Sequence, residues 1–487
     1  MIISELDPRH RQQPVVVIGT GFGSLFFVHR LLERQPEARV LMLERGPYRP
    51  WDAQLESNEN SVVPSNSTFR SIGKDKPWNF TIGYGGGTNC WYGTTPRLHP
   101  SDFRLKSLYG RGRDWPVSYE EMEPYYMAAE EIMDISGPED IRIISPRSRP
   151  YPQPPHKFSA ADRLMKKAQP DRHFVMPTAR ARVANAQRPQ CCATFRCNLC
   201  PVHAKFTALN GFRHITENPN VRILTEAEVI EVERSGASSV STVRFRHASG
   251  EQRVGCDLCV LGANAIHSPA ILLRSGIGHP LLGRGLNEQL GYAVEVLLDG
   301  LDNLDGSTIT TGANYSLYDG AFRSEHGGAF LVFDNRFPYG VRTEIGRWRQ
   351  TLAMNVTVED ELRNENRVSV DSSGNVAVHF QGHSAYAARG AERSLGLLPE
   401  VLAPLPVEKI VFKGYRPSES HLQGTLRMGR NRADSVVDRS QVHHGIRNLI
   451  VVGTSVLPTC PPVAPSLTAA ALSLRAADIA AGKAPSW

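Results

Sequence analysis

The chain lacks the features that mark membrane, secreted and nucleic-acid-binding proteins. It has no apolar run of about 18 residues, the length at which a membrane-spanning helix is suspected. The start, Met1 to Pro8, is short and polar, without the basic stretch and apolar core of a secretory signal. Lysine and arginine are interspersed with acidic residues, and the net charge is only +6. We therefore expect a cytoplasmic protein with no membrane span and no nucleic-acid partner.

Cysteine is also scarce, with 8 residues in a chain of 487. This excludes a disulfide-stapled scaffold of the kind found in small secreted proteins. Hydrophobic residues make up 41% of the chain, enough for buried cores. A chain of this length exceeds one average domain, so two domains are expected. The cysteines are unevenly spread, because four of them fall between Cys191 and Cys200.

The N-terminal region has the pattern of a nucleotide-binding βαβ unit. The apolar run Val15 to Ile18 predicts a buried parallel strand, and residues 25–34 predict an amphipathic helix. Between them lies the turn Gly19-Thr-Gly-Phe-Gly-Ser24, and a second buried strand over residues 39–43 ends at Glu44. A glycine turn in this strand–helix–strand context is typical of dinucleotide binding.

Each position of this turn has a physical task. Gly19 turns the chain tightly, Gly21 lets the backbone approach a pyrophosphate, and Ser24 allows close packing of helix against strand. Phe22 and Gly23 then lie at the helix N-terminus, where free N–H groups favour phosphate. Glu44 is placed to accept hydrogen bonds from ribose hydroxyls, which disfavours the 2′-phosphate of NADP. FAD and NAD both remain open from these residues.

Two further regions carry signals. Residues 83–87 read Gly-Tyr-Gly-Gly-Gly, a second flexible loop, and residues 291–415 alternate apolar and polar side chains with many turn signals. The alternation predicts an antiparallel sheet with one face in water. Near the C-terminus stand His421-Leu-Gln-Gly-Thr-Leu-Arg-Met-Gly429, then residues 451–459, then Pro465-Ser-Leu-Thr468 opening an alanine-rich helix. We expect both chain ends to form one nucleotide-binding domain with a histidine at its edge.

These islands resemble the glucose-methanol-choline (GMC) family of FAD-dependent oxidoreductases. The similar segments are the N-terminal turn, residues 85–91, 114–120, 262–269, 272–276 and 283–287, and the C-terminal block, in the family's order. The resemblance implies an α/β fold with a discontinuous Rossmann-like FAD-binding domain and an antiparallel-sheet α+β substrate domain. We predict the FAD-binding domain over residues 1–105, 201–280 and 440–487. The substrate domain is predicted over residues 106–200, with the cysteine-rich loop, and 281–439.

The family also implies a reaction and a set of site residues. An alcohol CH–OH group, here of a sugar, glycoside or polyol, is oxidised to a carbonyl while its hydride passes to flavin N5. His421 matches the base that takes the hydroxyl proton, which suits an imidazole near its ordinary pKa. Beyond the N-terminal turn and Glu44, predicted cofactor contacts are Gly86, Gly87, Thr88, Asn89, Cys90, Ala263, Gly453, Pro465 and Ser466. Cys90 stands where some relatives bond a histidine covalently to the flavin; a buried thiol is the alternative.

One position departs from the family. An asparagine or histidine usually precedes the proline near the C-terminus and orients the substrate hydroxyl, but here the residue is Ala464. Either another group serves, or the substrate anchors itself, or the chemistry is altered. The departure favours one alternative, a non-redox lyase that retains FAD. A second alternative is a cofactor-holding electron-transfer subunit, against which the intact His421 argues.

The cysteine cluster has its own hypothesis. Closely spaced thiolates followed by a proline suit an iron–sulfur cluster. Cys192, Cys197 and Cys200 are similar to the cysteine run of family members that carry a three-iron (3Fe-4S) cluster, with Cys191 as a candidate fourth ligand. Free thiols, a local disulfide and zinc are the alternatives. If iron is bound, electrons would leave singly to a redox acceptor protein, and the enzyme would be a dehydrogenase.

Overall fold

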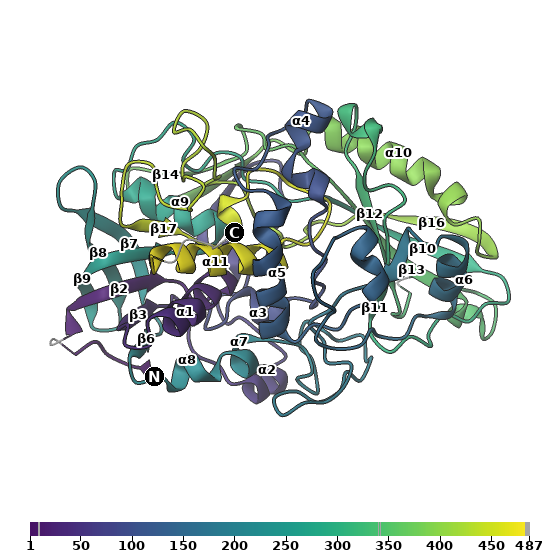
Figure 1. The fold of residues 1–487 in the computed structure, drawn as a ribbon, viewed down its shortest axis with the longest axis horizontal. Helices are drawn as coiled ribbons and strands as arrows, with labels where there is room; N and C mark the ends of the chain where they lie inside the picture. Colours follow the sequence, from purple (N-terminus) through teal and green to yellow (C-terminus); the bar gives the residue numbers. More distant parts are fainter. Residues whose placement is uncertain (8–9, 339, 341, 483–487) are drawn as a thin grey trace.

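The computed structural model describes residues 1–7, 10–338, 340 and 342–482. The molecule is elongated, with one large sheet near each end and helices and long loops between them (Figure 1). Within the described residues the strands form an eight-stranded, a six-stranded and a three-stranded sheet. The chain is thus a mixed α/β protein.

The eight-stranded sheet contains the predicted βαβ unit. Its order is β1-β6-β3-β2-β9-β8-β7, and β17 also pairs with β9. The central strand β2 runs parallel to both β3 and β9, and its residues Val16 and Val17 are fully buried. Strand β3 ends one residue before Glu44, and the helix α1 begins at Phe22, three residues before its predicted start. The bounds are β1 (Ile2–Ile3), β2 (Gln12–Ile18), β3 (Val40–Leu43), β6 (Val221–Leu224), β7 (Glu228–Arg234), β8 (Val240–His247), β9 (Gly250–Leu261) and β17 (Leu449–Val451).

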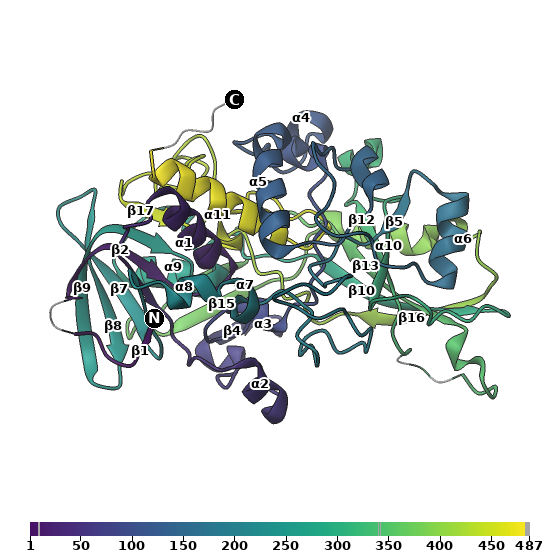
Figure 2. The same cartoon turned by 60° about the horizontal axis from the view of Figure 1, so that its bottom comes forward.

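Three helices from distant parts of the chain pack together beside this sheet. They are α1 (Phe22–Arg34), α5 (Tyr119–Met133) and the alanine-rich α11 (Ser466–Ala480), seen side by side in Figures 1 and 2. The Arg34 guanidinium donates to Asp478 across α1 and α11 at 2.7 Å. The hydroxyls of Tyr126 and Thr468 join α5 to α11 at 2.9 Å. The two ends of the chain therefore belong to one packing unit, as the sequence predicts.

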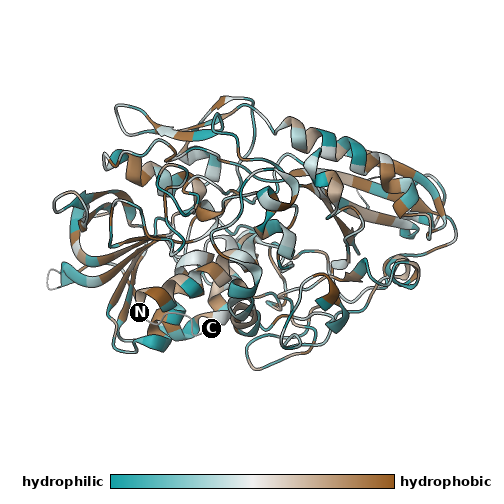
Figure 3. Ribbon diagram, turned by 45° about the horizontal axis from the view of Figure 1, so that its top comes forward, coloured by the Kyte–Doolittle hydropathy of each residue, from teal (hydrophilic) through white to brown (hydrophobic). Residues whose placement is uncertain are grey.

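The six-stranded sheet forms the other end of the molecule. Its order is β16-β10-β13-β12-β11-β5, and every pairing is antiparallel, which confirms the sheet expected over residues 291–415. The strands are β5 (His173–Val175), β10 (Leu290–Leu298), β11 (Thr310–Asn314), β12 (Ala329–Asp334), β13 (Thr351–Val358) and β16 (Val407–Tyr415). Helix α10 (Ala385–Val401) covers one face through Ala387, Ala391 and Leu398. In Figure 3 this helix, at the upper right, alternates hydrophobic and hydrophilic residues accordingly.

Smaller elements connect the two large sheets. The third sheet has the order β14-β15-β4, so β4 of the predicted first FAD-binding segment pairs with β15 of the predicted substrate segment. The bounds are β4 (Arg70–Gly73), β14 (Arg367–Val370) and β15 (Val376–Phe380), with the helices α2 (Trp51–Ser57), α3 (Gly87–Cys90), α4 (Leu105–Tyr109), α6 (Ala160–Ala168), α7 (Ala208–Gly211), α8 (Arg213–Glu217) and α9 (Asn264–Arg274). No helix in the described part of the chain is long and apolar enough to span a membrane.

Candidate active site

A cavity of about 810 Å³ lies between the two large sheets. Its size falls in the range of about 300–1,000 Å³ typical of ligand pockets. Most of the residues predicted to hold a cofactor line it: Gly19, Gly21, Phe22, Gly23, Glu44, Gly86, Gly87, Cys90, Ala263, Gly453, Pro465 and Ser466, together with His421. Segments from the start, middle and end of the chain thus meet at one cavity.

Three predicted residues do not line the cavity. The Ser24 side chain is fully buried against the end of β9, where a Cβ on Gly262 would lie 2.2 Å from Ser24 Oγ. Thr88 turns inward to accept a hydrogen bond from the N–H of Ala208, and the Asn89 amide donates to the carbonyl of Tyr84. All three side chains lie behind the cavity wall, and the predicted contacts of these residues with the cofactor stay predictions.

The glycine turn leaves an open backbone surface at the N-terminus of α1. A Cβ on Gly21 would meet nothing within 4 Å, so the space above it belongs to the cavity. Gly21 is the N-cap of α1 and no side chain caps the helix. The N–H groups of the first turn and the positive end of the helix dipole are therefore available to an anion such as a pyrophosphate.

Glu44 organises the same region. Its Oε2 accepts hydrogen bonds from both the N–H and the hydroxyl of Thr20, at 3.0 and 2.7 Å. Its Oε1 accepts from the N–H groups of Gly46 and Gly83, at 2.9 and 3.1 Å. The carboxylate thus ties the first glycine turn to the second glycine loop, and its predicted contact with a ribose stays a prediction.

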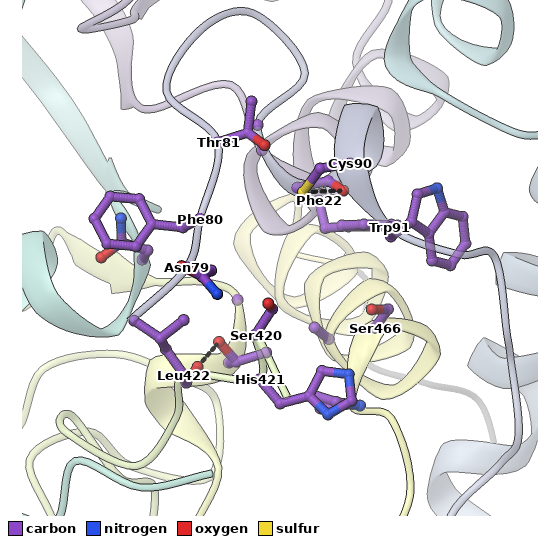
Figure 4. Close-up of a pocket in the computed structure, with 18 of the residues that line it drawn as sticks. Phe22, Asn79, Phe80, Thr81, Cys90, Trp91, Ser420, His421, Leu422 and Ser466 are labelled. Atoms are coloured by element: carbon purple, nitrogen blue, oxygen red, sulfur yellow. Dashed lines mark hydrogen bonds between the residues drawn. The ribbon is translucent and has the colours of Figure 1, made fainter. Parts of the chain in front are cut away.

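Cys90 lies at the end of helix α3, and Lys205 holds the backbone on either side of it. The buried Lys205 ammonium donates to the carbonyls of Asn89 and Trp91, both at 2.8 Å, on either side of Cys90. Burial lowers the pKa of Lys205 to about 8. Figure 4 shows Cys90 beside Phe22 and Trp91 on one side of the cavity.

His421 lies on the other side, across from Phe22 and Cys90 (Figure 4). Its Nδ1 is 3.0 Å from Oε1 of Gln289, and its Nε2 makes no hydrogen bond to any of the described residues. Burial lowers the pKa of His421 to about 4, well below the ordinary value expected from the sequence, so the ring is neutral at pH 7. A neutral imidazole with one nitrogen open to the cavity can accept a proton.

Glu288 fixes the backbone that carries this histidine. It is fully buried, and its carboxylate accepts from the N–H groups of Glu419 and His421 at 3.2 and 3.1 Å. The ammonium of Lys76 neutralises its charge through a buried ion pair. Between the two N–H groups, Ser420 has a φ of 60°, a left-handed conformation that costs energy in a non-glycine residue. Neither Glu288 nor Gln289 was singled out from the sequence.

Comparison with known proteins identifies the family. The model of the C-terminal GMC oxidoreductase domain matches residues 400–473, and that of the N-terminal domain matches residues 172–291. The chain is a member of the GMC oxidoreductase family. It is therefore an FAD-type oxidoreductase of a family that acts on alcohols and sugars.

Several relatives of this GMC oxidoreductase align with nearly its whole length. It is 26% identical to the fructose dehydrogenase large subunit of Gluconobacter japonicus, in an alignment that covers 95% of this chain and 97% of the relative. It is 27% identical to the 6'''-hydroxyparomomycin C oxidase of Streptomyces lividus, covering 95% and 90%. The crystal structure of pyridoxine 4-oxidase from Mesorbium loti superposes with a TM-score of 0.65 at 18% identity, covering 96% of this chain and 99% of that one. The predicted α/β fold class is thereby confirmed.

The residues around the cavity fit the FAD of this family. The glycine turn and the uncapped α1 N-terminus suit the pyrophosphate, since both present N–H groups without a side chain in front of them. Gly86, Gly87 and Cys90 line the cavity between that turn and His421, on the side where the ring system would have to extend. Gly453, Pro465 and Ser466 close the same region from the C-terminal segment.

The cavity lining contains polar groups, although Ala464 itself offers none. Asp334, Asn355, Thr357, Arg416 and Glu419 also line the cavity. The acids are paired: Arg336 donates to Asp334 at 3.1 Å, and Arg416 donates to Oε2 of Glu419 at 2.9 Å. Burial raises the pKa of both carboxyls, that of Glu419 to about 7. The wall therefore offers hydrogen bonds with little net charge.

The cysteine cluster does not assemble as predicted. Cys192 is exposed, whereas Cys197 and Cys200 are buried, and all are free thiols. Three of the thiols have different polar partners. Cys191 contacts the Thr308 hydroxyl, Cys192 contacts the Thr194 hydroxyl, and Cys197 contacts the Arg180 guanidinium. Ala193 and Phe195, which lie within the cysteine run, have positive φ values of 51° and 66°.

In consequence, the described residues contain no group of three or more His, Cys, Asp or Glu side chains that could hold a metal ion. The iron–sulfur ligand set Cys192, Cys197 and Cys200, with Cys191 as a fourth, is not supported, and neither is zinc. The local disulfide is not formed either.

Proposed function

We propose that this protein oxidises a CH–OH group of a neutral sugar, glycoside or polyol to a carbonyl, with His421 as the base. The observation that carries the proposal is the position of His421, whose unpartnered Nε2 lies across the cavity from the glycine turn that suits FAD. FAD, when bound, supplies the chemistry of accepting the carbon-bound hydrogen with its electron pair.

The protein's own part is to bind the alcohol and to take up its hydroxyl proton. A hydroxyl oriented toward Nε2 of His421 can donate its proton there, which leaves the oxygen electron-rich and promotes loss of the hydrogen on the adjacent carbon. The low pKa of His421 keeps this nitrogen unprotonated at neutral pH.

The substrate class follows from the polar wall. Asp334 and Glu419 each form an ion pair with an arginine, so neither carboxyl requires a cationic substrate group as its partner. Hydroxyl groups, in contrast, can both donate to carboxyls and accept from amides such as that of Asn355. The names of the two relatives, a fructose dehydrogenase and an oxidase of a hydroxyparomomycin, point to carbohydrate substrates as well.

The test is anaerobic addition of sugars, glycosides and polyols to the flavin-loaded protein, with the oxidised-flavin absorption band as the readout. Bleaching of the band by a neutral polyhydroxy compound supports the proposal. Formation of product without bleaching of the band would instead support a lyase. If no substrate is consumed and the band persists, the result would support a cofactor-holding subunit.

A further inference from the structure

The Gln289 side chain lies directly behind His421, on the side away from the cavity. It is only 2% exposed. Its amide nitrogen donates to the carbonyls of Pro461 and Val463, at 2.7 and 2.8 Å, and its oxygen lies 3.0 Å from Nδ1 of His421. All the polar atoms of the amide are therefore used within the protein.

These contacts leave one orientation for the amide and one tautomer for the histidine. Peptide carbonyls only accept hydrogen bonds, so the group facing Pro461 and Val463 must be the NH₂. The group facing His421 is then the amide oxygen, which also only accepts. Nδ1 of His421 must therefore carry a hydrogen, and in the neutral ring Nε2 carries the lone pair.

We propose that Gln289 is a positioning residue that holds His421 in the Nδ1–H tautomer, so that its basic Nε2 faces the cavity. The inference rests on the proposed role of His421 as base. In the other tautomer Nε2 would carry the hydrogen, and the side facing the substrate would hold no acceptor for a hydroxyl proton.

The same amide also sets the distance between His421 and the wall that bears Ala464. Pro461 and Pro462 have no N–H groups, so this segment is held through its carbonyls. Gln289 holds those of Pro461 and Val463, and the Thr357 hydroxyl holds that of Pro462 at 2.6 Å. Gln289 is thus the residue that connects the base to the segment where the family's usual second polar residue is missing.

The direct test is ¹⁵N NMR of the holoenzyme labelled at histidine, with the His421 signals assigned by their loss in His421→Asn. We expect the Nδ1–H tautomer in the unmodified protein and in Gln289→Glu, which keeps an oxygen acceptor. Gln289→Leu should populate the Nε2–H form. Gln423→Leu is the matched control, because Gln423 is equally buried and contacts the same segment at Cys460, 2.7 Å away, rather than His421.

An Nε2–H tautomer in the unmodified protein, or an unchanged tautomer in a folded Gln289→Leu, would overturn the inference. A second readout is the anaerobic bleaching rate with a reactive sugar. We expect the bleaching rate of Gln289→Leu to fall by at least about tenfold, which is less than the effect of removing a general base altogether. Its flavin content should be retained. The control should keep its rate. If no alcohol bleaches the flavin, the proposed function fails while the NMR result still decides the tautomer.

Discussion

Gly23 at the start of α1 packs against Gly453 near the other end of the chain, so closely that a Cβ on Gly23 would lie 2.5 Å from the Gly453 nitrogen. Both residues line the cavity. The backbone on each side cannot give way without moving α1 or the loop after β17. We expect Gly23→Ala to lower both the thermal midpoint of the protein and its flavin content.

Gly21 provides the matched control. A Cβ there meets no atom within 4 Å, and its φ of −81° suits any residue. Gly21→Val should therefore leave the apoprotein's thermal midpoint within experimental error of the parent, while the side chain blocks the cofactor's approach and lowers flavin content. Equal destabilisation by both variants would contradict the assignment of Gly23 to packing and Gly21 to binding.

The base prediction concerns His421. We expect His421→Ala to slow anaerobic flavin bleaching by about 10²- to 10⁴-fold, the contribution typical of a general base. Stopped-flow absorbance measures the rate directly, and flavin content should be unchanged because the ring contacts Gln289 rather than the glycine turn. A variant that is bleached as fast as the parent would remove His421 from the mechanism.

The pH dependence follows from the lowered pKa of the same residue. Burial lowers the pKa of His421 to about 4, so the base stays unprotonated down to that pH. The acidic limb of the bleaching rate should then fall near pH 4 instead of near 6.5, the ordinary value for histidine.

The same shift affects stability with a definite sign. Between pH 6.5 and about 4 the unfolded chain binds a proton at this histidine that the folded chain does not, so stability falls as the pH falls through that window. His421→Asn should flatten this part of a curve of urea midpoint against pH. A steeper curve in the variant would reverse the assigned direction.

A stability prediction concerns the buried Arg323, which is paired with two buried carboxylates and with the partly exposed Asp319. Its guanidinium donates to Asp102 at 2.8 Å and to Glu359 at 2.7 Å, and all three side chains are almost fully buried. Arg323→Met would leave two unpaired buried acids and should cost about 3–5 kcal/mol in denaturant unfolding. Arg163→Met removes the exposed pair with Asp305 and should cost no more than about 1 kcal/mol.

Local patterns predicted the parts of the fold that local physics decides. The run Val15 to Ile18, the glycine turn and Glu44 specify the βαβ unit, and the alternation over residues 291–415 specifies the antiparallel sheet. The His421 motif likewise led to the cavity. The burial of Ser24 between α1 and the end of β9 agrees with its predicted packing role, whereas the inward direction of the Thr88 and Asn89 side chains could not be read from the patterns.

Two failures have a common physical origin in long-range contacts. Gln289 reaches His421 across 132 positions of chain, and the only local sign was the polar Glu288-Gln289 pair just before an apolar strand. The cysteine spacing suggested a ligand set, but spacing does not report backbone conformation. Two left-handed residues, Ala193 and Phe195, lie within the cysteine run, and the Arg180 guanidinium donates to Cys197 Sγ.

The segment from residue 460 to 463 has a practical consequence for changing what the enzyme accepts. The carbonyls of this segment accept hydrogen bonds from the Gln289 amide, the Thr357 hydroxyl and the backbone N–H of Asp360. These donors lie within or close to strands of the six-stranded sheet. Because these donors hold the residues directly before Ala464, we expect a change in their positions to move Ala464 as well. To change the width of the cavity, substitutions at Gln289 and Thr357 are therefore expected to be more effective than substitutions within residues 460–463.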